Sequence, residues 1–305
     1  MTNVTHRKVV DGFTFFNELD LLEIRLAELS CVVDRFILVE ATKTFSGLPK
    51  PLHYVDNKQR YAQWAEKINH IVIDFPQNLA DEPASAWIRE RLQRDAISQG
   101  FVGLEKADIA IISDVDEIPN CKVLSRCLAA HDMDRTLVCM EAATFNYTLD
   151  LCAPSVRWNV GPRLTAIGNI KTANEMRRHR VPYSKKLAKL GLERATQKWV
   201  TKRSFKRSVT IELAANSAWH FTYLGSHDDY ATKIKSFSHQ ELNTPEMLAA
   251  EFFERKRRAG MSVYAGREEK LERVAPDRLP DYVVRNFERF SHLLSPETLT
   301  ALRAR

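Results

Sequence analysis

The chain has 305 residues, of which 44% are hydrophobic, with only 10 Gly and 12 Pro. This composition excludes a disordered or collagen-like chain and supplies enough apolar side chains for one large domain or two modest ones. The five Cys residues form no C-x-x-C pair, which argues against a zinc ribbon or a disulfide framework and favours a reducing compartment. No window approaches about 18 consecutive apolar residues, and the first residues lack the apolar core of a signal peptide, so we expect a cytoplasmic protein.

The net charge of +6 comes from 45 basic and 39 acidic residues, and it is unevenly distributed. Residues 171–207 hold 13 Lys or Arg and two acids, whereas the rest of the chain holds 32 basic and 37 acidic residues. This basic segment is interpreted as a solvated face, or as a surface that associates peripherally with an anionic membrane. Nucleic-acid binding is not expected, because the segment belongs to no recognised nucleic-acid-binding fold.

The first 140 residues alternate short β-branched runs with amphipathic stretches. Helices are predicted at 18–29 and 84–99, where apolar residues recur every three or four positions. Strands are predicted at 7–11, 35–40, 70–75, 108–113 and 136–141. This alternation is typical of an α/β fold with a mostly parallel central sheet flanked by helices.

The second half follows a less regular pattern. Residues 151–243 are largely polar apart from an apolar run at 217–224, so we expect an irregular region there. In the tail, 244–305, helices are predicted to begin at Thr244-Pro245-Glu246 and at Ser295-Pro296-Glu297, each with a capping hydroxyl and a Pro in the first turn. The absence of repeats and of a Gly/Ser linker predicts a single domain over 1–305.

The strongest chemical signal is at 107–119, where a buried strand is predicted to end in Asp114, Asp116 and Glu117. In open α/β sheets ligands bind at the carboxyl ends of strands. Three carboxylates gathered there repel one another, and a divalent cation such as Mn²⁺ or Mg²⁺ would offset the repulsion. Such a metal could neutralise a departing diphosphate, as in a nucleotide-sugar transferase of the GT-A type.

Two alternatives remain for these acids. They can simply cap a strand end in contact with solvent. A phosphatase of the haloacid dehalogenase type also ends a strand in Asp-x-Asp, with the first acid, here Asp114, as nucleophile. The late position of the motif and the following Glu117-Ile118-Pro119 fit that type poorly. A third class, a non-catalytic basic protein that binds polyanions or membranes, would depend on the basic segment.

Three runs, at 11–29, 33–52 and 111–119, resemble glycosyltransferase family 17. The resemblance extends to residues 219–225 and 235–243 and to Trp87, Glu90, Gln93 and Arg94. It implies a GT-A fold and an inverting transfer of a sugar, N-acetylglucosamine, from a UDP-sugar to a glycan or lipid-linked glycan acceptor, with Mn²⁺ or Mg²⁺ as cofactor. It also implies that 1–150 binds the nucleotide-sugar and that 151–243 forms the acceptor side.

The resemblance implies roles for individual residues. Asp114 and Asp116 would hold the metal, and His220 would complete its shell, with His239 as the next candidate. The residues expected to contact the nucleotide-sugar are Phe15, Asn17, Glu18, Glu40, Arg94, Asp114 and Gly161. Alternative interpretations are a core position for Phe15, a simple strand-end acid for Glu40 and a surface ion pair with Glu90 for Arg94. The general base is left open among Asp229, Glu241 and Glu141.

Overall fold

The computed structural model describes residues 7–80, 82–179, 201–202, 204–263 and 268–304. Its strands form one ten-stranded sheet in the order β10-β7-β6-β8-β4-β1-β2-β3, with β9 pairing to β6 and β5. The strands are β1 (Val9–Phe15), β2 (Arg35–Ala41), β3 (Ile68–Ile73), β4 (Ile109–Asp114), β5 (Glu117–Pro119), β6 (Thr136–Tyr147), β7 (Leu151–Trp158), β8 (Arg163–Ala166), β9 (Thr210–Leu224) and β10 (Glu272–Arg273).

The first half of the sheet is parallel. β1 lies between β2 and β4, and β3 continues the sheet beyond β2, all in the same direction. β4 is buried on both faces, with Ile109 and Ile111 packing on one side and Ala110 and Ile112 on the other. Such doubly covered strands read as continuous apolar runs, which is why the sequence locates them within a few residues. The predicted α/β class is confirmed.

The second half is not the irregular region that we expected. β6 pairs antiparallel with β7 and β8, while β9 runs parallel to β6. The expected apolar run at 217–224 is the end of β9, whose first half is mostly exposed and therefore has no apolar signature. The alternation of buried and exposed residues along β9 is interrupted further by register shifts in its pairing with β6 and by a positive φ of 48° at Asn216.

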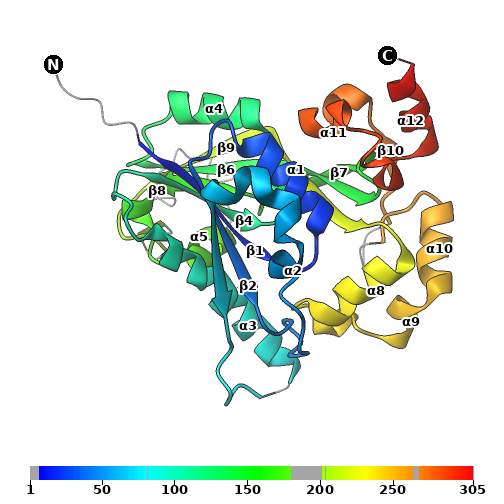
Figure 1. The fold of residues 1–305 in the computed structure, drawn as a ribbon, viewed down its shortest axis with the longest axis horizontal. Helices are drawn as coiled ribbons and strands as arrows, with labels where there is room; N and C mark the ends of the chain where they lie inside the picture. Colours follow the sequence, from blue (N-terminus) through cyan, green and yellow to red (C-terminus); the bar gives the residue numbers. More distant parts are fainter. Residues whose placement is uncertain (1–6, 81, 180–200, 203, 264–267, 305) are drawn as a thin grey trace, which may run out of the picture.

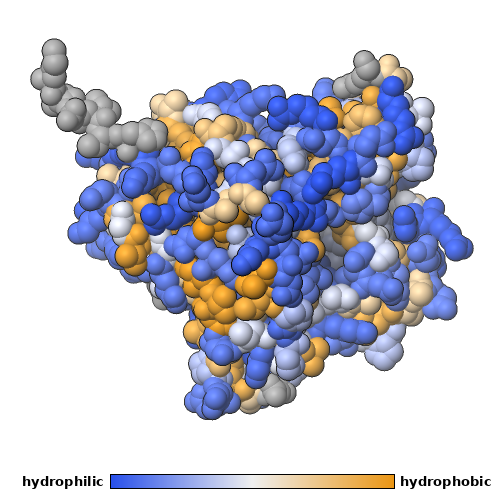
Figure 2. Space-filling view, viewed as in Figure 1, coloured by the Kyte–Doolittle hydropathy of each residue, from blue (hydrophilic) through white to orange (hydrophobic). Residues whose placement is uncertain are grey.

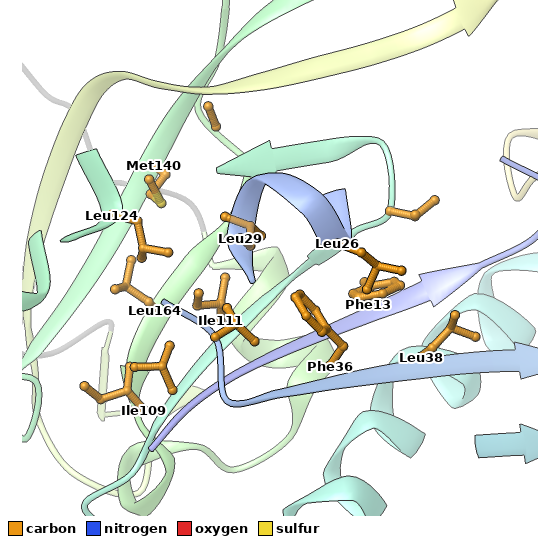
Figure 3. Close-up of a cluster of buried hydrophobic side chains, with 14 of the residues drawn as sticks. Phe13, Leu26, Leu29, Phe36, Leu38, Ile109, Ile111, Leu124, Met140 and Leu164 are labelled. Carbon is orange, nitrogen blue, oxygen red and sulfur yellow. The ribbon is translucent and has the colours of Figure 1, made fainter. Parts of the chain in front are cut away.

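Helices cover both faces of the sheet (Figure 1). On one face α1 and α4 pack on β1, β2 and β4, and Figure 3 shows this cluster, with Phe13, Leu26 and Ile111 at its centre. On the other face, the turn after α3 and the helix α5 pack on the alternate residues of the same strands. The helices named here are α1 (Leu19–Leu29), α3 (Pro83–Asp95), α4 (Cys121–Ala130), α5 (Ala173–Arg178), α8 (His227–Ser236), α9 (Pro245–Leu248), α10 (Ala250–Arg258), α11 (Asp281–Arg285) and α12 (Pro296–Arg303).

The C-terminal helices lie at one end of the molecule (Figure 1). Both predicted helix starts are confirmed, because the side chains of Thr244 and Ser295 accept hydrogen bonds from the backbone N–H groups of Met247 and Thr298. Residues of α11 and α12 share a hydrophobic cluster with α1 and β9. This shared cluster ties the C-terminal tail to the sheet.

The surface is mixed in character. Figure 2 shows one face as largely hydrophilic, with apolar side chains gathered in a patch below and to the left of its centre. Among the residues that the structure describes, no helix has the length and apolarity that crossing a membrane requires.

Candidate functional site

Arg25 of α1 supports residues 114–117 at the end of β4, which are called the acidic loop because they include Asp114, Asp116 and Glu117. The Arg25 guanidinium and the Asp11 carboxylate are both fully buried, and Nη2 of Arg25 lies 2.6 Å from Oδ1 of Asp11. Nη1 of Arg25 donates to the backbone carbonyls of Asp114 at 2.9 Å and of Glu117 at 2.8 Å. A buried ion pair therefore fixes the path of the backbone that carries both acids of the Asp-x-Asp motif.

Asp114 is bound by two arginines. Its Oδ1 lies 2.9 Å from Nη2 of Arg94, and its Oδ2 lies 3.2 Å from Nη2 of Arg177. Burial would raise the pKa of this carboxyl, but the two guanidinium groups outweigh it and hold the pKa well below its usual range. Arg94 also pairs with Glu90 at 2.8 Å, but this pair is buried and not the surface pair of the alternative interpretation.

Asp116 is paired with a lysine. It is 7% exposed, and its Oδ2 lies 2.7 Å from Nζ of Lys233 on α8. His220 of β9 approaches the same oxygen, with Nε2 at 3.9 Å, while Nδ1 of this ring is buried without a hydrogen-bond partner. Burial lowers the pKa of His220 to about 4, so the imidazole is neutral at physiological pH. Neutral imidazole is the form that ligates metals.

Glu117 faces inward and completes the acidic cluster. Its carboxylate accepts hydrogen bonds from Nε1 of Trp158 and from Arg177, and the Trp158 ring stacks on His220 with centroids 4.5 Å apart. Burial raises the pKa of Glu117 to about 7, against the opposing charge of Arg177. The three acids are thus matched by three cations from the chain itself, on α3, α5 and α8. The repulsion that led us to expect a metal is largely offset by these side chains.

A cavity of about 410 Å³ opens above this cluster. This volume lies in the range of small-molecule sites. Its walls come from the carboxyl ends of β1 and β4, from α3 and α5, and from β9 and α8. The acidic residues among them are Glu18, Glu90, Asp114, Asp116 and Glu117, and the basic ones are Lys43, Lys50, Arg94, Arg177, Arg178 and Lys233. Because basic residues outnumber acidic ones, the cavity suits an anionic ligand.

The predicted nucleotide-sugar residues are only partly brought together. Phe15, Glu18, Arg94 and Asp114 line this cavity. Phe15 is only 2% exposed and belongs to the core cluster, in agreement with its alternative interpretation. Burial raises the pKa of Glu18, with Lys233 opposing the shift, and its Oε2 accepts hydrogen bonds from the backbone N–H groups of Phe16 and Asn17.

Three other predicted residues lie outside the lining of this cavity. Asn17 lines a neighbouring hollow instead. The carboxylate of Glu40 is fully buried and paired with Lys50 at 3.1 Å and with Nε2 of His70 at 3.2 Å. Gly161 packs against β6, where a Cβ atom would come within 2.8 Å of the Met140 carbonyl oxygen. Glu40 and Gly161 therefore have structural contacts that account for their residue types.

The three candidates for the general base do not line the cavity that contains Asp114. Asp229 accepts hydrogen bonds from the backbone N–H and the hydroxyl of Ser226 and so caps α8. Glu241 is paired with His239 at 2.6 Å, and Glu141 accepts a 3.5 Å hydrogen bond from the backbone N–H of Asn216. Of the three, Asp229 lies on the second hollow, of about 610 Å³, which shares Glu18, Tyr223 and Lys233 with the first.

Comparison with known proteins assigns the chain to a family. Residues 1–181 match the family model described as glycosyltransferase family 17. The chain belongs to glycosyltransferase family 17. Similar curated proteins include the beta-1,4-mannosyl-glycoprotein 4-beta-N-acetylglucosaminyltransferases of Rattus norvegicus and Homo sapiens, each 31% identical over 118 residues. The aligned part covers 37% of this chain and 22% of each relative, so it spans about a fifth of their length.

Solved structures with some similarity include two synthases. One is glucosyl-3-phosphoglycerate synthase from Mycobacterium tuberculosis in complex with Mn²⁺, UDP-glucose and glycerol 3-phosphate, at 13% identity and a TM-score of 0.32, covering 70% of this chain and 72% of that chain. The other is 4-diphosphocytidyl-2C-methyl-D-erythritol synthase from Anaerococcus prevotii, at 10% identity and a TM-score of 0.36, covering 68% and 87%. Membership of glycosyltransferase family 17, established from the sequence, favours a transferase over the phosphatase alternative.

Two side chains of this site carry donor atoms that a divalent cation could use. Among the described residues, no group of three or more His, Cys, Asp or Glu side chains is already arranged to hold a metal ion. Asp116 and His220 do converge, with one oxygen and one nitrogen donor 3.9 Å apart. The Nδ1 atom of the His220 ring is buried, and no described group of the protein forms a hydrogen bond with it. Asp114, by contrast, is already bound by two guanidinium groups, and Asp116 is paired with Lys233.

Three important residues were missed from the sequence. Arg25 lies inside the run that resembles the family, but an Arg on an amphipathic helix reads as a surface residue. Arg177 belongs to the basic segment, of which residues 180–200 and 203 lie outside the described residues. Lys233 is 117 residues from its partner Asp116, and no local pattern links the two. The one signal in the sequence is the excess of carboxylates at 114–117, which indicates that basic side chains from distant parts of the chain must pair with them.

Proposed function

We propose that this chain is an inverting glycosyltransferase of the GT-A type that transfers N-acetylglucosamine from UDP-N-acetylglucosamine to a hydroxyl of a glycan or lipid-linked glycan. Support comes from its family and from one observation above all. The Asp114 and Asp116 carboxylates lie at the carboxyl end of a parallel strand, in a cavity whose basic residues outnumber its acids. A nucleoside diphosphate carries the complementary charge.

In this proposal each part of the cavity has a task. Arg94 and Arg177 keep Asp114 ionised and oriented, because two planar guanidinium groups restrict a carboxylate more than solvent does. Lys233 and Arg178 are available for the phosphates. Asp116 and His220 would hold Mn²⁺ or Mg²⁺, which supplies positive charge to the departing diphosphate. Trp158 stacks on His220 and restricts its rotation.

The base would take a proton from the acceptor hydroxyl. We propose Asp229 for this role before Glu241 and Glu141, because Asp229 lines the hollow adjoining the cavity. A base there requires the acceptor to enter through that hollow.

We propose further that the protein acts in the cytoplasm at the inner face of a membrane. The basic residues of 171–207 would approach anionic lipids, where each contributes about 1 kcal/mol.

Calorimetric titration with UDP and with UDP-N-acetylglucosamine, with and without Mn²⁺, tests the proposal. We expect binding to the wild type that strengthens with Mn²⁺, and loss of the Mn²⁺ dependence in Asp116→Asn. Lys43→Met removes a lysine that also lines the cavity; this variant should keep that dependence and serves as the matched control. If UDP binds under no metal condition, the assignment of this cavity to a nucleotide-sugar is wrong.

A further inference from the structure

The contact between Lys233 and Asp116 bears on how a metal reaches this site. Nζ of Lys233 lies 2.7 Å from Oδ2 of Asp116, the same oxygen that faces His220. The ammonium is the ordinary form of a lysine side chain, and here the Asp116 carboxylate, only 7% exposed, is its counter-charge. A full positive charge therefore already occupies the carboxylate that the proposed metal site needs.

We propose that Lys233 holds Asp116 as long as no nucleotide is bound, and that lysine and a divalent cation exclude each other at this carboxylate. The inference rests on the metal site of the proposed function. Two cations at one oxygen repel each other strongly when they are shielded from water, and Asp116 is only 7% exposed. A lysine amine is a point charge on a flexible stem, which lets it withdraw without disturbing α8.

The withdrawn amine has a destination. Lys233 lines both hollows and has Glu18 as its second acidic neighbour, so it can turn from Asp116 towards the space above the loop. An anionic diphosphate in the cavity would attract it there. In this scheme the nucleotide binds together with its cation, and its phosphates attract Lys233 away from Asp116. Without nucleotide, Lys233 stays on Asp116 and the chain binds the metal weakly.

Titration of the nucleotide-free chain with Mn²⁺, followed by the paramagnetic resonance signal of free Mn²⁺, tests this inference. Lys233→Met should bind Mn²⁺ at least about ten-fold more tightly than the wild type, because Asp116 loses its competing cation. Lys233→Arg should bind as weakly as the wild type, since it retains the charge. Lys235→Met, which removes an exposed lysine from the same helix α8, is the matched control and should leave the affinity unchanged.

Circular dichroism confirms that each variant is folded before the titration. Equal Mn²⁺ affinity in the wild type and Lys233→Met, or no Mn²⁺ binding to either, would overturn the inference. Because Mn²⁺ alone is the probe, a failure here differs from a failure of UDP to bind, which would count against the nucleotide-sugar function.

A separate observation concerns two cysteines. Cys31, just after α1, and Cys121, the first residue of α4, have Sγ atoms 2.8 Å apart. Cys31 is exposed and Cys121 is partly exposed, whereas Cys127, Cys139 and Cys152 are buried. All five are free thiols in the structure, so the close contact between Cys31 and Cys121 is not a disulfide bond. The two helices also flank the acidic loop, since Arg25 of α1 binds its backbone and α4 begins two residues after β5 ends.

We infer that Cys31 and Cys121 are a site of reversible oxidation. Each thiol loses a proton and one electron as the S–S bond forms, and a low-molecular-weight disulfide such as oxidised glutathione takes up both electrons and both protons to give two thiols. Cys31, the more accessible thiol, would react first and form a mixed disulfide. Cys121 would then displace the glutathione. The bridge links positions 90 residues apart and stabilises the folded state by restricting the unfolded chain.

Treatment with oxidised glutathione, followed by proteolysis and mass spectrometry without reductant, tests this site. We expect a cross-linked peptide pair containing Cys31 and Cys121, absent in Cys31→Ser and retained in Cys127→Ser, which changes a cysteine of the same helix. The oxidised wild type should also unfold at a higher temperature than the reduced protein. Glutathione remaining on Cys31 beside a free Cys121, or two unmodified thiols, would contradict the inference.

Discussion

Replacing Arg25 with Met should strongly destabilise the protein, because Arg25 supports the acidic loop from a fully buried position. The change leaves the Asp11 carboxylate buried without its partner, and it removes one donor from each of the carbonyls of Asp114 and Glu117. Removing one partner of a buried ion pair costs about 3–5 kcal/mol. Each buried polar group left unsatisfied adds about 1–3 kcal/mol. The loss is therefore a large part of a typical total stability of about 5–15 kcal/mol.

Urea unfolding followed by tryptophan fluorescence measures this loss. Arg25→Met should lower the free energy of unfolding by at least about 3 kcal/mol. The double variant Asp11→Leu, Arg25→Met should lose less than Arg25→Met alone, because it removes the buried charge as well. Arg303→Met breaks only the exposed pair with Glu288 and should leave the midpoint unchanged. A loss below about 1 kcal/mol for Arg25→Met, or a double variant less stable than the single one, would refute the reasoning.

Two further predictions concern stability. Gly161→Ala should lower the free energy of unfolding by about 1–3 kcal/mol in the same assay, because its Cβ would approach the Met140 carbonyl oxygen to 2.8 Å; an unchanged value would show that the turn at 159–162 can move away from β6 at no cost. Burial lowers the pKa of His179 to about 4 from an ordinary 6.5. The unfolded chain therefore binds a proton there first, and stability falls by up to about 3 kcal/mol as the pH drops from 6.5 to 4. Urea unfolding at several pH values should give a flatter profile for His179→Gln than for the wild type, and two parallel profiles would contradict this origin of the pH dependence.

The sequence locates the parallel half of the sheet because its inner strands, β1, β2 and β4, are buried on both faces. β2 and β4 read as unbroken apolar runs, and α1 shows a regular apolar face that covers them. The antiparallel half gives no such signal. In β9 the residues before Ser217 are mostly exposed, and only partners more than 70 residues away in β6 hold the strand in place. Long-range pairing of a half-exposed strand leaves little trace in local composition.

The same contrast applies to the site. The acids at 114 and 116 are visible because charged residues that end a buried strand break its pattern. Their cations come from α3, α5 and α8, at separations of 20, 63 and 117 residues, and each looks like an ordinary surface residue in its own helix. The candidates for the general base were chosen by their position near strand ends and loops. In the structure Asp229 caps a helix and Glu141 contacts a strand bulge, roles that depend on neighbours no local pattern identifies.

The two acids of the motif are held in different ways, and this difference predicts different costs of neutralising them. Asp114 lies between two buried arginines, each with an Nε atom that already lacks a partner. Asp114→Asn leaves each guanidinium with one carboxylate in place of two, Glu90 for Arg94 and Glu117 for Arg177. Asp116→Asn releases one lysine, which is 24% exposed and can turn to solvent or to Glu18. Asp114→Asn should therefore lower the midpoint of urea unfolding more than Asp116→Asn does, while Asp116→Asn should have the larger effect on Mn²⁺ binding. Equal effects of both variants in both assays would mean that the arginines and the lysine are interchangeable counter-charges, and the separate tasks assigned to the two carboxylates would have to be abandoned.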